Sequence, residues 1–343
     1  MESSGFTDRQ KRIIGALLGV HAGDSLGATL EFVRWEETKA LFPTGLTSII
    51  GGGHFEWEPG HATDDTDLTR AVLLAYSKRS TERKSYVDVL EAAADNMLDW
   101  ATGRWPGRQP GSSPKDIGGA TFVGLTRYRQ SIASGRKDPR GCGSGQGSAG
   151  NGSLMRCIPT ALFAANEEER LQHSIDISAV THDDIRCTIA CAAYNTIVAQ
   201  LIDGQSPATA VGEGKACATV LAVKTTSNKT HLRPNADAVV RAIELGEKLK
   251  PTELVEDGPG ILPGRGRGFV LESLTLAIAA VLDDRPFKEV ICDIVMLGAD
   301  SDTNAAIAGG LLGARDGIDA IPKDWRDVLQ FGEEFTSIAL ALS

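Results

Sequence analysis

The stretch IIGALLGVHA, residues 13–22, contains pairs of adjacent residues that recur every three to four positions: Ile13-Ile14, Leu17-Leu18 and His21-Ala22. Such spacing places these residues on one face of an α-helix. The same period recurs further along the chain, at Val87, Leu90, Ala94, Met97 and Leu98. The pattern therefore predicts a chain built from amphipathic helices.

Helical patterns cover most of the remaining sequence. Further helices are predicted at approximately 154–165, 183–202, 208–220, 235–249, 269–282 and 287–296. Ser85 and Asp88 resemble a capping box before the helix that contains Met97. The one weak strand candidate is 46–50, and helices without a sheet indicate an all-α fold.

Three segments rich in glycine or proline interrupt the helices, at 102–119, 136–152 and 251–268. The composition does not shift across any of them. We therefore interpret them as surface loops within one domain that spans residues 1–343.

Composition limits the possible partners and the compartment. The net charge is −10 and the pI is near 5.2, which argues against broad binding to nucleic acid or anionic membranes. The polar N-terminus lacks the core of a signal peptide, and apolar runs such as 274–282 are too short to span a bilayer. The six cysteines form no C-x-x-C pair and are expected to be buried thiols. We therefore expect a cytoplasmic protein, although a nuclear location is also compatible with these features.

Two acidic clusters stand directly before apolar, helix-periodic runs. They are Thr63-Asp64-Asp65-Thr66, before 68–76, and Asp300-Ser301-Asp302-Thr303, before 305–312. One acid or threonine is enough to cap a helix, whereas adjacent carboxylates repel each other unless a cation holds them. Oxygen ligands without nearby histidine or cysteine favour Mg²⁺ or Mn²⁺ over Zn²⁺. The alternative is two well-capped helices with solvated acids.

A glycine-rich run, Gly145-Gln146-Gly147-Ser148-Ala149-Gly150, precedes Asn151-Gly152. No apolar strand comes before it, so a Rossmann turn is excluded. Glycines let backbone amides approach an anion, and the helix that follows adds its positive end, which predicts a diphosphate cradle. The alternative is a loop without a ligand.

Thr181-His182-Asp183-Asp184 carries a third acid pair. A cap at Thr181, with Asp184 three residues on, explains these acids without a metal. His182 is then either structural or a neighbour of a ligand.

Together these segments resemble one family, the ADP-ribosylglycohydrolases. This group includes the dinitrogenase-reductase-activating glycohydrolase and the ADP-ribosyl-acceptor hydrolases. The resemblance covers about 13–317, and its motifs occur in this order: Gly23-Asp24-x-x-Gly27-x-x-x-Glu31, Thr63-Asp64-Asp65-Thr66, Asp116-Ile117-Gly118, Gly150-Asn151-Gly152-x-x-Met155-Arg156, Thr181-His182 and Gly298-Ala299-Asp300-Ser301-Asp302-Thr303-Asn304.

The resemblance implies a single-domain orthogonal helical bundle with a dinuclear metal cleft that holds two Mg²⁺ or Mn²⁺ ions. By motif match, one ion would be held by Thr63, Asp64, Asp65 and Asp302. The other would be held by Glu31, Asp300, Asp302 and Thr303, with Asp302 bridging.

The resemblance also implies the reaction, which is cleavage of the bond between the anomeric carbon of ADP-ribose and an acceptor. The acceptor would be a protein side chain, such as arginine or serine, or a small compound. Glu31 or Asp65 could take a proton from water, Asp116 could protonate or orient the leaving group, and the transition state should be oxocarbenium-like. The expected substrate-binding residues are Gly147, Ser148, Gly150, Asn151, Gly152, Ser153, Met155 and His182.

Two alternatives remain at this point. Two ions would also suit a phosphoesterase acting on an ADP-ribose phosphate such as ADP-ribose-1″-phosphate. A catalytically silent, ADP-ribose-binding member is the other alternative, although an intact acid set argues against it. Residues 105–114, with Arg104 and Arg108, match no family motif, so they either shape acceptor choice or form a surface loop.

Overall fold

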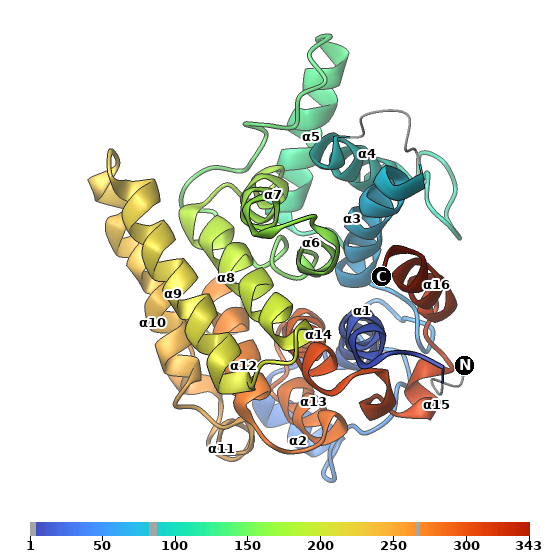
Figure 1. Cartoon of the computed structure of the whole chain (residues 1–343). Coiled ribbons are helices and arrows are strands. Elements are labelled where there is room, and N and C mark those ends of the chain that lie inside the picture. The colour runs from blue at the N-terminus through green and yellow to red at the C-terminus, as the bar shows by residue number, and fades with distance from the viewer. Residues whose placement is uncertain (1–4, 82–87, 265–267) are drawn as a thin grey trace.

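The computed structural model describes residues 5–81, 88–264 and 268–343. Within these ranges it contains helices and two isolated β-bridges but no β-strand, and Figure 1 shows the helices crossing at different angles. The all-α prediction is therefore confirmed. The strand candidate at 46–50 is wrong: it is an irregular loop that Leu46 and Ile49 anchor by burying their side chains.

Helices from α1 near the N-terminus to α16 at the C-terminus make up the fold. In chain order they are α1 (Asp8–Gly27), α2 (Trp35–Leu41), α3 (Asp64–Thr81), α4 (Val89–Ala101), α5 (Gly119–Ala133), α6 (Ile158–Phe163), α7 (Glu167–Ala179), α8 (Ile185–Ile202), α9 (Pro207–Thr226), α10 (Arg233–Gly246), α11 (Pro251–Asp257), α12 (Val270–Leu282), α13 (Phe287–Met296), α14 (Ser301–Asp316), α15 (Lys323–Arg326) and α16 (Gly332–Leu342).

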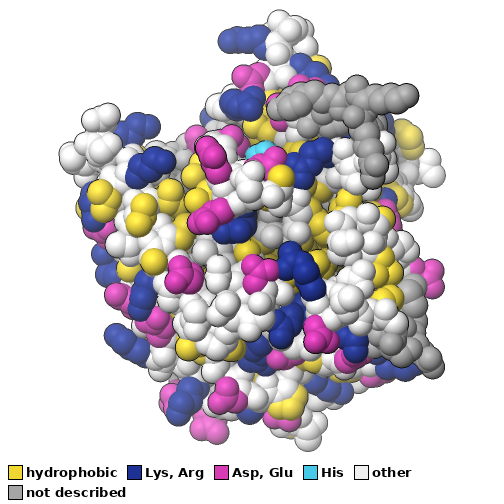
Figure 2. All heavy atoms as spheres, viewed as in Figure 1, with side chains coloured by type: hydrophobic (Ala, Val, Ile, Leu, Met, Phe, Trp, Pro, Cys, Tyr) yellow, Lys and Arg dark blue, Asp and Glu magenta, His cyan; other side chains and the backbone are white. Residues whose placement is uncertain are grey.

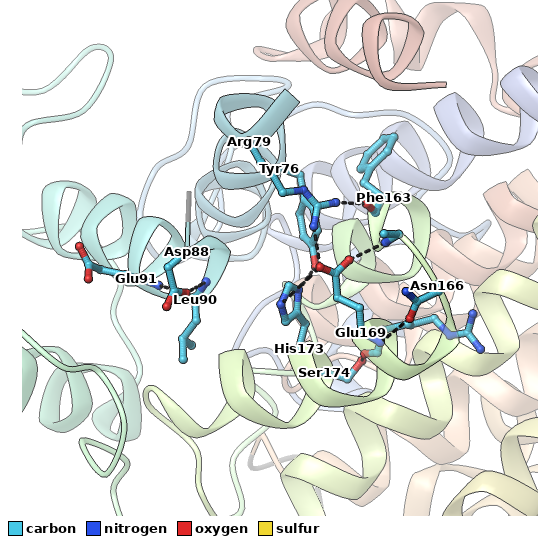
Figure 3. Close-up of polar contacts among 12 residues, drawn as sticks. Tyr76, Arg79, Asp88, Leu90, Glu91, Phe163, Asn166, Glu169, His173 and Ser174 are labelled. Carbon is cyan, nitrogen blue, oxygen red and sulfur yellow. Dashed lines mark hydrogen bonds and ion pairs between the residues drawn. The ribbon is translucent and has the colours of Figure 1, made fainter. Parts of the chain in front are cut away.

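Every helix predicted from the periodicity is present in the structure, although the boundaries differ. The expected loop at 251–268 is partly wrong, because α11 begins there with Pro251 in its first turn, a position that proline tolerates. Ser85 and Val87 lie outside the described residues. Asp88 itself caps α4, since its carboxylate accepts hydrogen bonds from the amides of Leu90 and Glu91 (Figure 3). The predicted cap at Thr181 is wrong, because Asp184 is the N-cap residue of α8.

A glycine-lined crossing of α1 and α14 brings the two ends of the sequence together. A Cβ atom added to Gly19 would lie 2.1 Å from the carbonyl oxygen of Gly309, and one added to Gly15 would lie 2.5 Å from that of Gly313. At Gly27 the added atom would lie 2.4 Å from the Cα atom of Asp302. The backbones touch because no side chain separates them, so the acids at the end of α1 lie beside those at the start of α14.

Polar contacts hold the outer part of α3 against α6 and α7, as Figure 3 shows. The guanidinium of Arg79 donates to Glu169 at 2.8 Å and to the carbonyl of Phe163 at 2.7 Å. The hydroxyl of Tyr76 lies 2.9 Å from Nδ1 of His173. These bonds fix the helix whose first residues are Asp64 and Asp65.

The interior is apolar, and the surface carries mixed charge. Helix α8 is long and apolar enough to cross a membrane, yet 89% of it is buried within the fold, as for a core helix. All six cysteines are unpaired, and five of them are buried. Figure 2 shows basic and acidic side chains interspersed on one face, with hydrophobic side chains over α9, where Val220 and Val223 are exposed.

Candidate active site

The start of α14 separates the two interpretations of the acidic clusters. Asp300 stands at the N-cap position but makes no side-chain capping bond. Its carboxylate instead accepts a hydrogen bond of 2.5 Å from the side-chain amide of Asn151. At the start of α3, the hydroxyl of Thr63 does accept a bond from the amide of Asp65, at 3.3 Å. Capping therefore explains Thr63, but it does not explain the carboxylate of Asp300.

Carboxylates from three parts of the sequence form two groups that share one residue. Asp24, Asp65 and Asp302 each offer an oxygen within 4.8 Å of the others, and so do Glu31, Asp300 and Asp302. The second group contains the three carboxylates expected for one ion. The first group contains Asp65 and Asp302, as expected, but its third member is Asp24.

Asp24 is the residue that sequence reasoning missed. One of its oxygens accepts bonds from the amides of Thr63 and Thr66, at 3.1 and 3.2 Å, while the other has no hydrogen-bond partner among the described residues. The signal that could have found it is its position in the last turn of α1, in a Gly-Asp-x-x-Gly motif before Glu31. Alone, one acid at a helix end is also typical of a solvated surface, which is why the signal was weak.

Asp64 takes a different place from its neighbour. It is absent from both carboxylate groups found among the described residues. Its carboxylate and that of Asp116 repel each other, and both residues lie at the wall of a cavity. Thr303 donates to Asp65 at 3.2 Å, as does Thr63.

The chemistry of these donors fits hard divalent cations. Four buried carboxylate oxygens of these two groups have no hydrogen-bond partner among the described residues: Asp24 Oδ1, Glu31 Oε2, Asp65 Oδ1 and Asp302 Oδ1. Burial, followed by the charges of neighbouring acids, raises the pKa of Glu31 to about 9 and that of Asp302 well above its usual range. Burial likewise raises the pKa of Asp24 to about 6. Like charges at this density need protons or cations between them, and cations supply the missing partners.

Two left-handed residues hold two of these acids in place. Phe32, directly after Glu31, has a φ angle of 63°, and Ala299, directly before Asp300, has one of 59°. The amide of Phe32 donates to the carbonyl of Ala299 at 2.6 Å, and the amide of Ala299 donates to the carbonyl of Val33 at 2.7 Å. Non-glycine residues rarely adopt this conformation, and strain of this kind concentrates at functional sites.

A cavity of about 500 Å³ lies against the acids. Its lining includes these predicted residues: Glu31, Asp64, Asp116, Gly150, Asn151, Gly152, Met155, His182, Asp300 and Thr303. Thr63, Asp65 and Asp302 are buried beside it rather than on its wall. The fold thus brings together residues from both ends and the middle of the sequence.

Three predicted substrate-binding residues do not line the cavity: Gly147, Ser148 and Ser153. The amide of Gly147 donates to Asp184 at 2.6 Å, and that of Ser148 donates to the carbonyl of Gly145 at 3.2 Å. Ser153 is buried, and its hydroxyl accepts from Ser178 at 2.9 Å. The amides of Gly147 and Ser148 are already used within the chain, so this geometry does not support their predicted contact with a diphosphate.

The N-terminus of α5 lines the cavity instead, and sequence reasoning did not find it. Gly118, Gly119, Ala120 and Thr121 all face the cavity, and no side chain of the described chain caps this helix. The hydroxyl of Thr121 is buried and has no partner among the described residues. Free amides at the positive end of a fifteen-residue helix suit an anion.

His182 faces the same part of the cavity. A Cβ atom added to Gly150 would lie 3.3 Å from its Nε2 atom, and one added to Gly152 would lie 2.9 Å from its Cε1 atom. Arg156 donates to the hydroxyl of Thr181, which lies 2.7 Å from Nδ1 of His182. In the arrangement that satisfies all three groups, the hydroxyl proton goes to Nδ1, so Nε2 carries a proton towards the cavity. Burial, then the charge of Arg156, lowers the pKa of His182 to about 3, so the ring is a neutral donor.

Comparison with known proteins tests the family resemblance. The family model described as ADP-ribosylglycohydrolase matches residues 6–343. The chain belongs to the ADP-ribosylglycohydrolase family. It is 27% identical over 325 residues to the ADP-ribosyl-[dinitrogen reductase] glycohydrolase of Rhodospirillum rubrum, covering 94% of this chain and 92% of that protein.

Two further relatives extend the comparison. The ADP-ribosylarginine hydrolase Tri1 of Serratia proteamaculans is 29% identical over 330 residues, covering 95% of this chain and 77% of that protein. A solved ADP-ribosylglycohydrolase-related protein complex contains a chain that aligns with a TM-score of 0.71 and 28% identity, covering 98% of each chain. This ADP-ribosylglycohydrolase is therefore a glycosidase-type enzyme, and its reaction class is the hydrolysis of ADP-ribose linkages. Its family is metal-dependent, and its clustered acids could bind metal.

Proposed function

We propose that this protein hydrolyses the bond between the anomeric carbon of ADP-ribose and an acceptor, and that it uses two Mg²⁺ or Mn²⁺ ions. The observation that carries the proposal is the pair of carboxylate groups that share Asp302 beside a cavity of about 500 Å³. Arginine side chains are the acceptors to test first, because two relatives are named ADP-ribosylarginine hydrolases.

Each carboxylate group would hold one ion, with Asp302 common to both. Asp65 would bind the first ion, with Asp24, Asp64 or Thr63 as further oxygen ligands. Glu31, Asp300 and Thr303 would bind the second. When bound, such ions polarise a water and fix the vicinal hydroxyls of a ribose.

The chain's own groups would hold the rest of the substrate. Gly150 and Gly152 line the cavity, and their amides make no hydrogen bond to another described residue. Together with the Nε2–H group of His182 and the start of α5, they offer donors to a diphosphate. This assignment moves the diphosphate from Gly147 and Ser148 to the amides nearer the acids.

Two carboxyl groups beside the cavity are placed for proton transfer from water. Glu31 has one oxygen without a partner among the described residues, and a cation beside it would keep the carboxylate ionised so that it can accept a proton. Asp65 is the other candidate base. Asp116 also lines the cavity and would protonate or orient the leaving group. An oxocarbenium-like transition state would be stabilised by these negative charges.

We further propose that residues 1–343 act as one domain in the cytoplasm. The domain proposal is supported by a single cluster of buried apolar residues that extends from Ile13 to Ala339. Limited proteolysis tests it: one protease-resistant fragment of nearly full length is expected, and two stable fragments would contradict it.

The activity test uses the full-length protein with three substrates, each with and without added Mg²⁺. ADP-ribosylarginine peptide, ADP-ribosylserine peptide and ADP-ribose-1″-phosphate are incubated, and the release of ADP-ribose is followed by chromatography. Metal-dependent release from a peptide supports the proposal. Release from the phosphate alone indicates the phosphoesterase, and binding of ADP-ribose without release from any substrate indicates a silent member.

A further inference from the structure

A second cavity meets the first one at the acids. It has a volume of about 320 Å³, and Asp64 and Asp116 line both cavities. Much of its remaining wall comes from residues 107–116, most of which belong to the segment that matches no family motif. The two cavities thus lie on either side of one pair of carboxyl groups.

The wall formed by residues 107–116 is firmly attached to α3. Asp67, one turn after Asp64, accepts hydrogen bonds from the indoles of Trp100 and Trp105, at 2.9 and 2.7 Å. The guanidinium of Arg108 donates to the carbonyls of Trp100 and Ser112, at 2.7 and 2.8 Å. The segment is therefore an ordered part of the site, and both the carboxylate of Asp67 and the guanidinium of Arg108 are already paired.

A row of aromatic rings joins the two cavities. Phe32 lines the first cavity and is 58% exposed. Its ring centroid lies 5.2 Å from that of His54. The ring centroid of Phe55 lies 4.8 Å from that of His54 and 5.9 Å from that of Trp57. Trp57 lines the second cavity, is 8% exposed, and its indole N–H has no partner among the described residues.

A cation of the chain itself lies at the second cavity, where it donates to the carbonyl of Phe55 at 3.3 Å. The ammonium of Lys115, an exposed residue, lies 4.9 Å from the centre of the Trp57 ring. The carboxyl groups of Asp64 and Asp116 line the same cavity. A planar guanidinium satisfies such surroundings well, because it stacks on aromatic rings and donates to carboxylates at the same time.

We propose that this second cavity is the acceptor subsite and that it receives a cationic, planar side chain such as the guanidinium of an ADP-ribosylated arginine. The inference rests on the proposed function, in which the substrate has two parts joined at the anomeric carbon. ADP-ribose fills the first cavity, and the acceptor extends past Asp64 and Asp116 into the second. Lys115 occupies the cation position when no acceptor is bound.

Substitutions that remove or reverse the charge of Lys115 test this assignment, and KM for an ADP-ribosylarginine peptide is the quantity measured. Lys115→Ala removes the competing cation, so KM for an ADP-ribosylarginine peptide should fall about two- to fivefold, the range expected for one exposed cation–π contact. Lys115→Glu should lower it further. The Kd of ADP-ribose, which fills only the first cavity, and KM for the neutral ADP-ribosylserine peptide should stay as in the wild type. The matched control is Lys288→Ala, which removes a lysine 5.5 Å from the ring of Trp325, away from both cavities.

A second variant tests whether the indole N–H group of Trp57 donates a hydrogen bond to the acceptor. Trp57→Phe keeps a ring but removes the unpartnered N–H group, and should raise KM for the arginine peptide about two- to tenfold, the range of one lost hydrogen bond. An unchanged or raised KM in Lys115→Ala, relative to Lys288→Ala, would overturn the acceptor subsite. So would cleavage of the serine peptide alone by the wild type, which leaves the proposed function intact. If the wild type binds ADP-ribose but cleaves neither peptide, the proposed function itself fails, and the acceptor assignment fails with it.

Discussion

Replacing Gly19 with alanine should disturb the crossing of α1 and α14 on which the acidic site depends. The new Cβ atom would lie 2.1 Å from the carbonyl oxygen of Gly309 and 2.8 Å from its carbon. Carbon–oxygen contacts lie near ~3.3 Å, so the two backbones must part by about 1 Å. Backbone cannot rotate away as a side chain can, and interiors tolerate such overpacking at a cost of about 1–3 kcal/mol.

A second glycine provides the matched control. Gly212 stands in α9, and a Cβ atom added there would meet nothing within 4 Å. Gly212→Ala should therefore stabilise the protein by about 0.5–1 kcal/mol, the gain in helix propensity alone. The two substitutions are chemically identical, so the opposite signs isolate the helix contact.

Thermal unfolding followed by circular dichroism measures the difference. At about 2.1 cal/mol/K per residue over 343 residues, 1 kcal/mol shifts Tm by about 1.4 °C. Gly19→Ala should lower Tm by about 1–4 °C, while Gly212→Ala should raise it by about 1 °C. Equal or higher stability of Gly19→Ala compared with Gly212→Ala would refute the close-contact argument. Because Asp24 and Asp302 flank the same crossing, Gly19→Ala should also weaken binding of Mn²⁺ in calorimetry.

Four further predictions concern the ions, the substrate and pH. Chelation by EDTA should abolish turnover while the circular dichroism spectrum is kept, and Mg²⁺ or Mn²⁺ should restore it; full activity of the metal-free protein would contradict the two-ion proposal. Asp302→Ala should damage both ion sites in a calorimetric titration, whereas Thr303→Ala should weaken chiefly one, because charge dominates the binding of hard cations; near-native binding of two ions by Asp302→Ala would rule out the bridge. Gly152→Val should weaken ADP-ribose binding in calorimetry, because a Cβ atom there lies 2.9 Å from the ring of His182 and fills the approach to the amides; an unchanged Kd would show that the diphosphate lies elsewhere. His21 has a pKa lowered by burial from 6.5 to about 4, and its Nε2 atom accepts from the amide of Phe331, so protonation favours the unfolded state and stability should fall as pH drops from 6.5 towards 4; this loss, on the order of 2 kcal/mol at pH 5, should be smaller in His21→Gln, and equal losses in both proteins would contradict it.

The order of the motifs predicted which distant segments lie close together in the fold. The motifs at 63–66, 150–156, 181–182 and 298–304 are short and lie far apart in the sequence, yet each stands at a helix start or in the loop before one. Glu31, Asp300 and Asp302 were predicted as one ligand set, and their oxygens do converge. The motifs could predict this because helix starts and glycine-rich loops are local features.

Gly147 and Asp24 illustrate what the motifs could not predict. Whether an amide is free depends on which acceptor the fold places beside it, and the fold placed Asp184 beside Gly147. Asp24 became a candidate ligand only because α1 crosses α14 closely enough to bring it near Asp65 and Asp302. The contribution of the start of α5 depends in the same way on its direction in the folded chain.

The sequence by itself determined the helices, the acidic helix starts and the family, because periodicity, capping residues and motif order are properties of neighbouring residues. Only the tertiary structure decided which carboxylate oxygens share a site and which backbone amides lack a hydrogen-bond acceptor. It also decided that residues 107–116 line a second cavity at Asp64 and Asp116. The physical reason is distance along the chain. Asp24 and Asp302 meet through the packing of the glycine-lined backbones of α1 and α14. Gly15, Gly19, Gly23 and Gly27 repeat every four residues, but this spacing does not specify which distant helix they contact.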